Sequence, residues 1–177
     1  CTLVAAASCH RRREEASSGI SYADMFTDRD ENTDPDGAKV SITLDGDYVS
    51  SSSDSVKIQN GIITISEEAV YEISGTLTEG MIYINADEKA KINLIFNGVS
   101  IYCCNNAPIY ILSCDKVFVT LTDGTESLLE NGGSFTSFDD NNIDGAVFSK
   151  QDLTFNGGGA LTVTSPSAHG IVCKDDL

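Results

Sequence analysis

The residues best suited to chemistry lie in the sequence FDDNNIDGAVFSKQDL, at residues 138–153. Asp140, Asn142 and Asp144 occupy alternate positions there, directly ahead of a glycine. This is the first half of a calcium-binding loop, because alternate side chains can turn toward one ion while the glycine permits a sharp bend. Gln151 stands where an EF-hand has its bidentate Glu. The pattern therefore predicts an irregular calcium site that other oxygen ligands complete.

A shorter copy of this phrase, HGIVCKDDL, lies at residues 169–177. Superimposing the copies places its acids on the turn that contains Gln151 and Asp152. Stacked like charges repel unless a cation or a Lys side chain lies between them, and the sequence leaves both options open. A solvated acidic turn is the alternative to a metal site. The candidate calcium ligands are the acidic and amide residues of both copies: Asp139, Asp140, Asn142, Asp144, Asp152, Asp175 and Asp176.

The acidic composition limits the partners of the protein. The chain of 177 residues has 27 Asp or Glu against 11 Lys or Arg, and its net charge is −16. Such a surface repels phosphates, so we expect no nucleic-acid partner. It favours hard divalent cations, which take oxygen ligands, and Ca²⁺ is the expected cofactor. Trp is absent, so any aromatic stacking on a sugar falls to Tyr and Phe.

Short runs rich in Val, Ile, Thr, Tyr and Phe fill the chain from residue 38 onward, separated by Gly, Asn, Asp and Ser. Both features are typical of β-strands joined by turns. The runs also superimpose on one another: residues 82–94 match 109–121, and residues 147–153 match 171–177. Three columns follow from this alignment: Ile84, Ile111, Val147 and Ile171; Ala90, Val117, Leu153 and Leu177; and Ile92, Val119 and Phe155.

Repeats of this kind indicate an all-β solenoid, a parallel β-helix in which each coil buries its apolar columns by stacking on the next. A β-sandwich is the alternative, and it predicts alternating hairpins in place of aligned columns. The last residues fall where an earlier copy begins a new strand, which predicts further coils after Leu177 and hence a C-terminally truncated solenoid. We expect a monomer.

The N-terminal sequence CTLVAAASCHRRREEASSG resembles the tail of a bacterial lipoprotein signal peptide, with Cys9 as the lipidated residue. Residues 1–20 are then a signal-peptide remnant and a disordered polar tether, and residues 21–177 form one folded domain. No apolar run reaches the roughly 18 residues that a membrane span needs. Membrane contact is therefore expected only through the lipid, at the outer surface of the cell.

Several phrases together resemble a known family, the bacterial and largely clostridial cell-surface carbohydrate-binding β-helix proteins. These phrases are YADMFTDRD at 22–30, LIFNGVSI at 94–101, DKVFVTLTDGTE at 115–126, and DDNNIDGAVFSKQDLTFNGGGALTV continuing into HGIVCKDDL. The resemblance covers residues 21–177. It implies a right-handed parallel β-helix with calcium at its corners, binding of plant cell-wall polysaccharide such as cellulose or pectic acid sugars, and an architecture related to pectate lyases. Gln151 and Cys173 depart from the pattern, which has Asp and Ser there.

Two pairs of side chains are the candidate carbohydrate contacts. Tyr83 and Tyr110 fall in one column and face away from the Ile columns, as a stacking ladder for sugars would. Lys150 and Lys174 lie beside acids in the two copies of the acidic phrase. A calcium-dependent polysaccharide lyase would use such a Lys as its base, but neighbouring acids make a Lys a poor base. We therefore expect a non-catalytic carbohydrate-binding protein, with a lyase and a structural or adhesive β-helix as alternatives.

Overall fold

The computed structural model describes residues 26–136 and 139–177, and all its regular elements are strands. An eight-stranded sheet, sheet A, contains β1 (Lys39–Gly46), β2 (Tyr48–Ser51), β5 (Val70–Leu77), β7 (Lys91–Cys103), β9 (Lys116–Leu121), β10 (Glu126–Asn131), β12 (Asp152–Gly157) and β13 (Ala160–Thr164). A six-stranded sheet, sheet B, contains β3 (Lys57–Gln59), β4 (Ile62–Ile65), β6 (Met81–Asn85), β8 (Ile109–Ser113), β11 (Gly145–Ser149) and β14 (His169–Cys173). The expected all-β class is confirmed.

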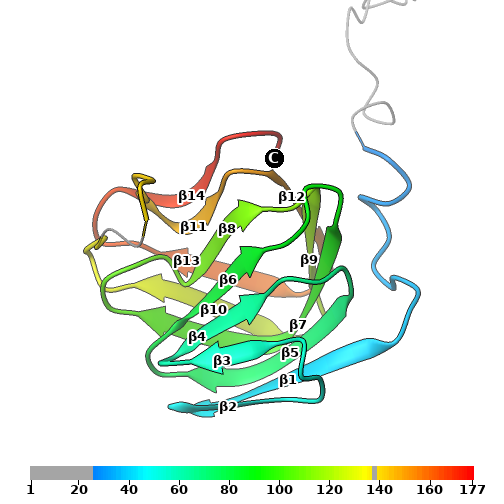
Figure 1. Cartoon of the computed structure of the whole chain (residues 1–177), viewed down its shortest axis with the longest axis horizontal. Coiled ribbons are helices and arrows are strands. Elements are labelled where there is room, and N and C mark those ends of the chain that lie inside the picture. The colour runs from blue at the N-terminus through cyan, green and yellow to red at the C-terminus, as the bar shows by residue number, and fades with distance from the viewer. Residues whose placement is uncertain (1–25, 137–138) are drawn as a thin grey trace, which may run out of the picture.

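Strands that follow one another in the chain mostly lie in different sheets (Figure 1). The chain passes from β4 in sheet B to β5 in sheet A, and then repeats this step from β6 to β7, β8 to β9 and β11 to β12. Neighbouring strands within each sheet pair in parallel, except for the antiparallel pairs β1–β2 and β3–β4 near the start. The pairing is therefore a mixture, with parallel ladders through most of the molecule.

The core lies between the two sheets. Ile82, Ile109 and Val147 are in register across β6, β8 and β11 and are fully buried. Leu94 and Val119 face them from sheet A, in register across β7 and β9. Burying branched apolar side chains in aligned rows removes their surface from water, which stabilises stacking of one strand on the next.

The columns predicted from the alignment are partly wrong, and three of the predicted pairs are displaced by two residues. Val147 lies beside Ile109, whereas we expected Ile111, which pairs with Ser149. Ile84 does pair with Ile111, and Val147 does pair with Ile171. The chain from Ile109 to Val117 is two residues longer than the chain between their partners, Val147 and Leu153. Because side chains alternate between faces with a period of two, such a slip leaves the apolar pattern unchanged.

The same error affects sheet A. Ile92, not Ala90, pairs with Val117, and Leu94, not Ile92, pairs with Val119. Ala90 belongs instead to the turn before β7, where its carbonyl accepts a hydrogen bond from Asp115 N–H at 2.8 Å. The predicted pairs of Val117 with Leu153 and of Val119 with Phe155 are confirmed. The predicted place of Leu177 beside Leu153 in a buried column is wrong, because Leu177 lies in no strand and is 72% exposed.

Gly75 lies at an irregularity in the pairing of β5 with β7. Its φ is +95°, and the register with β7 shifts between Ser74 and Gly75. A Cβ at this position would lie 2.1 Å from the carbonyl oxygen of Leu44 on β1. Gly157 repeats this arrangement against Leu121 at the end of β12, with a φ of +93°. Only glycine fits both the conformation and the close approach of the next strand.

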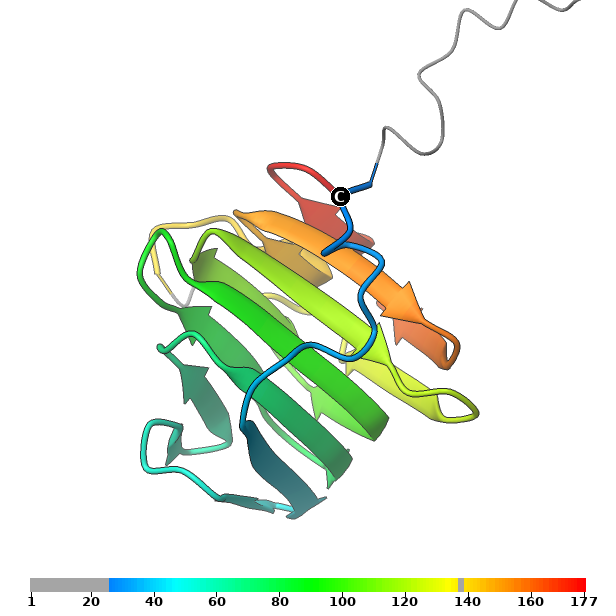
Figure 2. The ribbon, with the colours of Figure 1, turned by 90° about the vertical axis from the view of Figure 1, so that its right-hand side faces the viewer.

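The segment of residues 26–38, here called the strap, crosses the outer face of sheet A on its way to β1 (Figure 2). Asp30 fixes it there. The Asp30 carboxylate pairs with Lys116 Nζ at 2.6 Å and accepts a hydrogen bond from the Thr154 hydroxyl at 2.9 Å. Asn156 Nδ2 donates to the carbonyl oxygen of Asp30 at 2.8 Å. The strap is thus tied to both β9 and β12.

Within the described residues, no helix is long and apolar enough to cross a bilayer. The predicted lipidation residue Cys9 and the predicted tether at residues 10–20 lie outside the described residues, so both stay predictions.

Candidate functional site

The outer face of sheet B carries a column of aromatic side chains. Strand alternation turns Tyr83, Tyr110 and Phe148 outward, and the pairing of β6, β8 and β11 brings them into register. The ring centroids of Tyr83 and Tyr110 lie 5.4 Å apart, and those of Tyr110 and Phe148 lie 5.7 Å apart. Both distances are typical of favourable aromatic pairs. The predicted alignment of Tyr83 with Tyr110 is confirmed, and Phe148 extends it.

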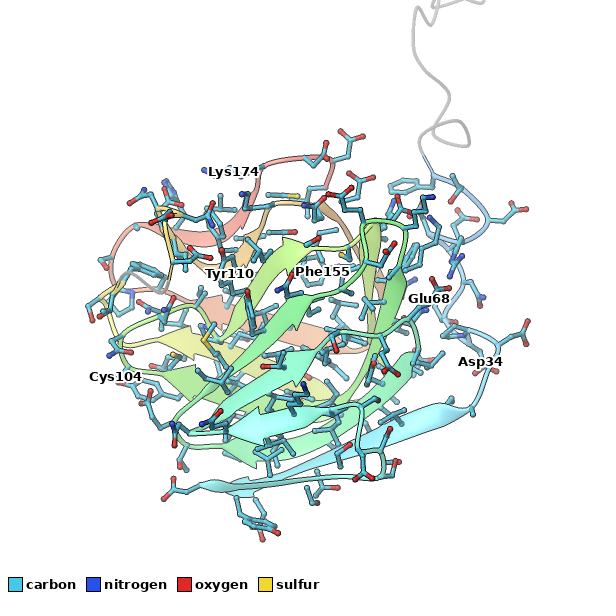
Figure 3. All side chains as sticks on the ribbon, in the orientation of Figure 1. Asp34, Glu68, Cys104, Tyr110, Phe155 and Lys174 are labelled. Carbon is cyan, nitrogen blue, oxygen red and sulfur yellow. The ribbon has the colours of Figure 1, made fainter. Side chains whose placement is uncertain are left out.

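The chain between β10 and β11 covers much of this column. Tyr110 and Phe148 are buried in a small apolar cluster with Met81, Cys103, Ala107 and Ile143, and Phe135 packs against it. Tyr110 projects from β8 in Figure 3, but its side chain is fully buried in the folded chain. It therefore does not form an open sugar platform in this structure. Tyr83, at the end of the column, is half-buried.

A hydrogen-bond network ties the acidic loop to this column. The Tyr110 hydroxyl donates to Asp139 Oδ2, and Asn141 Nδ2 donates to the Tyr110 oxygen at 2.9 Å. Asp139 Oδ1 accepts from the Asn141 backbone N–H at 2.8 Å, and Lys150 Nζ donates to Asn141 Oδ1 at 2.8 Å. Tyr110 and Lys150, both predicted sugar contacts, therefore hold the loop in place.

This network shifts two pKa values in opposite directions. Burial raises the pKa of Tyr110, and its hydrogen bond to the Asp139 carboxylate raises it further. For Asp139, desolvation works to raise the pKa, but hydrogen bonds from Tyr110 and Asn141 and the nearby Lys150 charge outweigh it, so the pKa is lowered. At neutral pH the loop therefore presents an ionised carboxylate beside a neutral phenol.

Lys174, the last of the predicted sugar contacts, lies at the same outer face. Its Nζ sits 5.5 Å above the centroid of the Phe148 ring, within the range of a cation–π interaction. Figure 3 places Lys174 at the rim of the molecule near the end of β14. The structure thus brings all four candidate contacts to one face, although only the lysines and Tyr83 reach the surface.

The acidic loop encloses a cavity of about 320 Å³ that Phe135, Thr136, Asp139, Asp140, Asn141, Asn142 and Ile143 line. Three of the seven predicted calcium ligands are in this lining. Asp144 is not, although its Oδ1 is buried without a hydrogen-bond partner. Among the described residues, no three acidic, His or Cys side chains lie close enough together to hold a metal ion. In this arrangement the loop offers oxygen ligands without a closed coordination shell, and calcium stays a prediction.

The other three predicted ligands belong to a different corner. Asp152 Oδ1 accepts a hydrogen bond from the Asp176 backbone N–H at 3.2 Å, and the carbonyl oxygen of Asp176 accepts one from Leu153 N–H at 3.0 Å. Asp175 is exposed beside them. These contacts are those of a hydrogen-bonded turn between successive strands. The structure therefore separates the predicted calcium set into a loop on sheet B and a turn beside β12.

A second cavity opens where Tyr83 ends the aromatic column. It measures about 320 Å³ and is lined by Gln59, Asn60, Ile62, Thr64 and Tyr83. It combines one aromatic ring with two amides and a hydroxyl, which can stack on a sugar ring and hydrogen-bond its hydroxyl groups. The sequence did not predict Gln59, Asn60 or Phe148 as residues of the candidate site. The pairing of β8 with β11 would have revealed Phe148, but the two-residue slip hid it.

Comparisons with known proteins agree with a sugar-related site. A family model described as carbohydrate-binding domain-containing protein matches residues 59–177. A protein of that description from Acetivibrio thermocellus is 28% identical over 99% of this chain and 58% of its own length. A solved structure, a gadolinium derivative of a polysaccharide lyase-like protein from C. thermocellum, superimposes with a TM-score of 0.73 and 29% identity. That match covers 77% of this chain and 56% of the other. The chain thus spans little more than half the length of either relative.

Proposed function

Because the chain belongs to the family of carbohydrate-binding domain-containing proteins, we propose that it binds plant cell-wall polysaccharide without cleaving it, through the outer face of sheet B. The observation that carries this proposal is the cavity at Tyr83, where the aromatic column reaches solvent beside Gln59 and Asn60. Sugar rings stack on aromatic faces through their apolar C–H surfaces, while amides bind the hydroxyl groups at the ring edge.

We propose further that the two sheets form the right-handed parallel β-helix that the repeats predict. The alternation of successive strands between sheets A and B supports it, as does the in-register parallel pairing across β6, β8, β11 and β14. Each coil then contributes one strand to the sugar-facing side, and Thr64, Tyr83, Tyr110, Phe148 and Val172 form successive positions along it. Because the acidic loop buries Tyr110 and Phe148, a polysaccharide would contact this side at the end formed by Thr64 and Tyr83.

Calcium binding and a cell-surface location complete the proposal. Asp140 and Asn142 in the loop cavity offer oxygen ligands of the kind that Ca²⁺ takes. The buried Asp144 Oδ1 without a hydrogen-bond partner supports a role for a cation nearby. Bound there, the ion would neutralise the loop carboxylates. The lipid-anchored location rests on Cys9 and the sequence around it.

Affinity electrophoresis through gels that contain cellulose derivatives or pectin tests the binding function. We expect retardation of the wild type and loss of most of it in Tyr83→Ala. Tyr48→Ala is the matched control, because Tyr48 is 71% exposed on β2 of the other sheet and lines neither sheet B cavity. Equal retardation of both variants would place the sugar elsewhere, and no retardation of the wild type on any glycan would overturn the function itself.

A calcium-dependent lyase is the second candidate, since the solved neighbour is described as polysaccharide lyase-like. Its base would be Lys150, whose Nζ donates a hydrogen bond to Asn141 Oδ1 next to the ionised Asp139. Incubation with polygalacturonate and Ca²⁺ separates the candidates, because a lyase releases unsaturated sugars that absorb in the ultraviolet. We expect no such absorbance. A signal that disappears in Lys150→Ala would establish the lyase.

A further inference from the structure

The strap leaves two adjoining cavities between itself and the outer face of sheet A. One measures about 340 Å³ and is lined by Asp28, Arg29, Asn32, Pro35, Asp36 and Asn93. The other measures about 270 Å³ and shares Arg29, Asp36 and Asn93 with the first. These three side chains therefore form the junction of a single hollow. It lies beside sheet A, which does not carry the aromatic column.

Asn93 presents its side-chain amide to this hollow. Its side chain faces outward on β7 and is only 8% exposed, yet it makes no hydrogen bond within residues 26–136 and 139–177. Among the described residues, the buried side-chain polar atoms without a hydrogen-bond partner are Asp144 Oδ1 and Asn156 Oδ1, so the donor and the acceptor of the Asn93 amide are both open to the hollow. A ligand with hydroxyl groups would satisfy both, since a hydroxyl donates and accepts.

The walls around Asn93 are held in place before any ligand arrives. Phe118 lies beside Asn93 in register on β9, and the Arg29 guanidinium packs 5.4 Å above its ring centroid. The Asp30–Lys116 ion pair fixes the strap one residue away from Arg29. A site whose parts are already positioned loses little conformational entropy on binding.

The charge around the hollow selects the ligand class. Arg29 is the one basic residue among the described residues that line the two cavities, whereas Asp28, Asp36 and Glu68 are acidic. Figure 3 shows Glu68 on the side of the molecule along which the strap runs. An anionic sugar would meet a net negative surface and be repelled. An uncharged sugar would accept hydrogen bonds from Arg29 and donate them to Asp36.

We propose that the hollow between the strap and sheet A, at Arg29, Asp36 and Asn93, is a second glycan subsite that takes an uncharged sugar unit. It rests on the proposed carbohydrate-binding function, and it adds both a location and a ligand class. Because the aromatic column lies on sheet B and the hollow on sheet A, the protein has two separate sugar contacts.

Titration with cellohexaose, followed by calorimetry and by the NMR signal of the Asn93 side-chain amide, tests this subsite. We expect Asn93→Val and Arg29→Gln each to weaken binding about tenfold, because hydroxyl groups are left without partners. Asn93→Val removes no hydrogen bond within the described chain, so the fold should persist. Lys89→Gln is the control for Arg29→Gln, since it removes the same charge from an exposed turn. Hexagalacturonate should leave the Asn93 signal unmoved.

The outcomes separate this subsite from the proposed function. Unchanged cellohexaose affinity in both variants, with loss only in Tyr83→Ala, would overturn the subsite and leave the function standing. A stronger effect on hexagalacturonate than on cellohexaose would overturn the uncharged ligand class. Absence of any binding by the wild type would overturn the subsite and the proposed function together.

Discussion

The Tyr110 hydroxyl donates a hydrogen bond to the carboxylate of Asp139, and this contact joins the aromatic column of sheet B to the acidic loop. The two features that the sequence marked as separate, one for sugars and one for calcium, are therefore a single structure. The acidic loop covers Tyr110, which is fully buried. Tyr83 is the residue of the aromatic column that lines the neighbouring cavity.

Removing this hydroxyl should loosen the loop. Tyr110→Phe keeps the buried ring and leaves Asp139 with the Asn141 backbone hydrogen bond. Hydrogen bonds to charged groups contribute about 1.5–3 kcal/mol, and because Asp139 is only half-buried we expect about 1 kcal/mol, measured by urea unfolding at pH 7. Tyr48→Phe, on an exposed tyrosine, should change nothing. Equal stability of the two variants would show that the contact does not hold the loop.

The stability that the Asp30 anchor of the strap contributes should decrease in acid. Desolvation works to raise the pKa of Asp30, but its ion pair with Lys116 and its hydrogen bonds from Thr27 and Thr154 outweigh that effect and hold the pKa well below the usual 3.8. A depressed carboxyl pKa stabilises the folded state above the unfolded pKa, and the stabilisation is lost as pH falls below about 4. Asp30→Asn should therefore lower the free energy of unfolding by about 3 kcal/mol at pH 7.

The same substitution should matter progressively less as the pH falls from 4 toward 2, because the unfolded wild-type chain then binds a proton at Asp30 that the folded chain does not bind, which lowers the stability of the wild type. Asp34→Asn is the control in the same strap. Asp34 pairs with Lys39 at 3.6 Å, but its side chain is 89% exposed, and surface pairs contribute little. A pH-independent difference between wild type and Asp30→Asn would contradict the assignment.

Calcium should raise the melting temperature if the acidic loop binds it. An ion at a hundred times its dissociation constant adds about 2.7 kcal/mol to the free energy of unfolding. We expect a chelator to reverse this gain, and Asp140→Asn to weaken it, since Asp140 lines the loop cavity. Asp54→Asn, at an exposed position outside that cavity, is the control. A melting temperature that chelator leaves unmoved would argue against a stabilising ion.

The position of Gly75 should tolerate no side chain. In Gly75→Ala the new Cβ would meet the Leu44 carbonyl oxygen in a left-handed conformation, so β1 and β5 would have to separate. We expect a loss larger than the roughly 1–2 kcal/mol that a positive φ alone costs. Gly98→Ala isolates that backbone cost, because its φ is +68° but no atom lies within 4 Å of its Cβ. Thermal unfolding of both variants separates the two causes.

The sequence by itself determined the strand class, the alternation of buried and outward residues, and the pairing of Tyr83 with Tyr110. These follow from a period of two along each strand and from repeated phrases along the chain. The sequence alignment paired Val147 with Ile111, whereas its partner in the structure is Ile109. The number of residues between one paired position and the next sets the register, and a change of two residues leaves the same side chains facing inward.

Only the tertiary structure decided which segments of the chain cover the outer faces of the two sheets. Nothing in the local pattern around Tyr110 indicates that residues from the distant acidic loop bury it, because loop path depends on contacts far apart in the sequence. The strap is a similar case: Arg29 and Asn93 line one hollow only because Asp30 pairs with Lys116 on the outer face of sheet A. Local periodicity fixes which face a residue takes, whereas long-range packing fixes which faces remain open to a ligand.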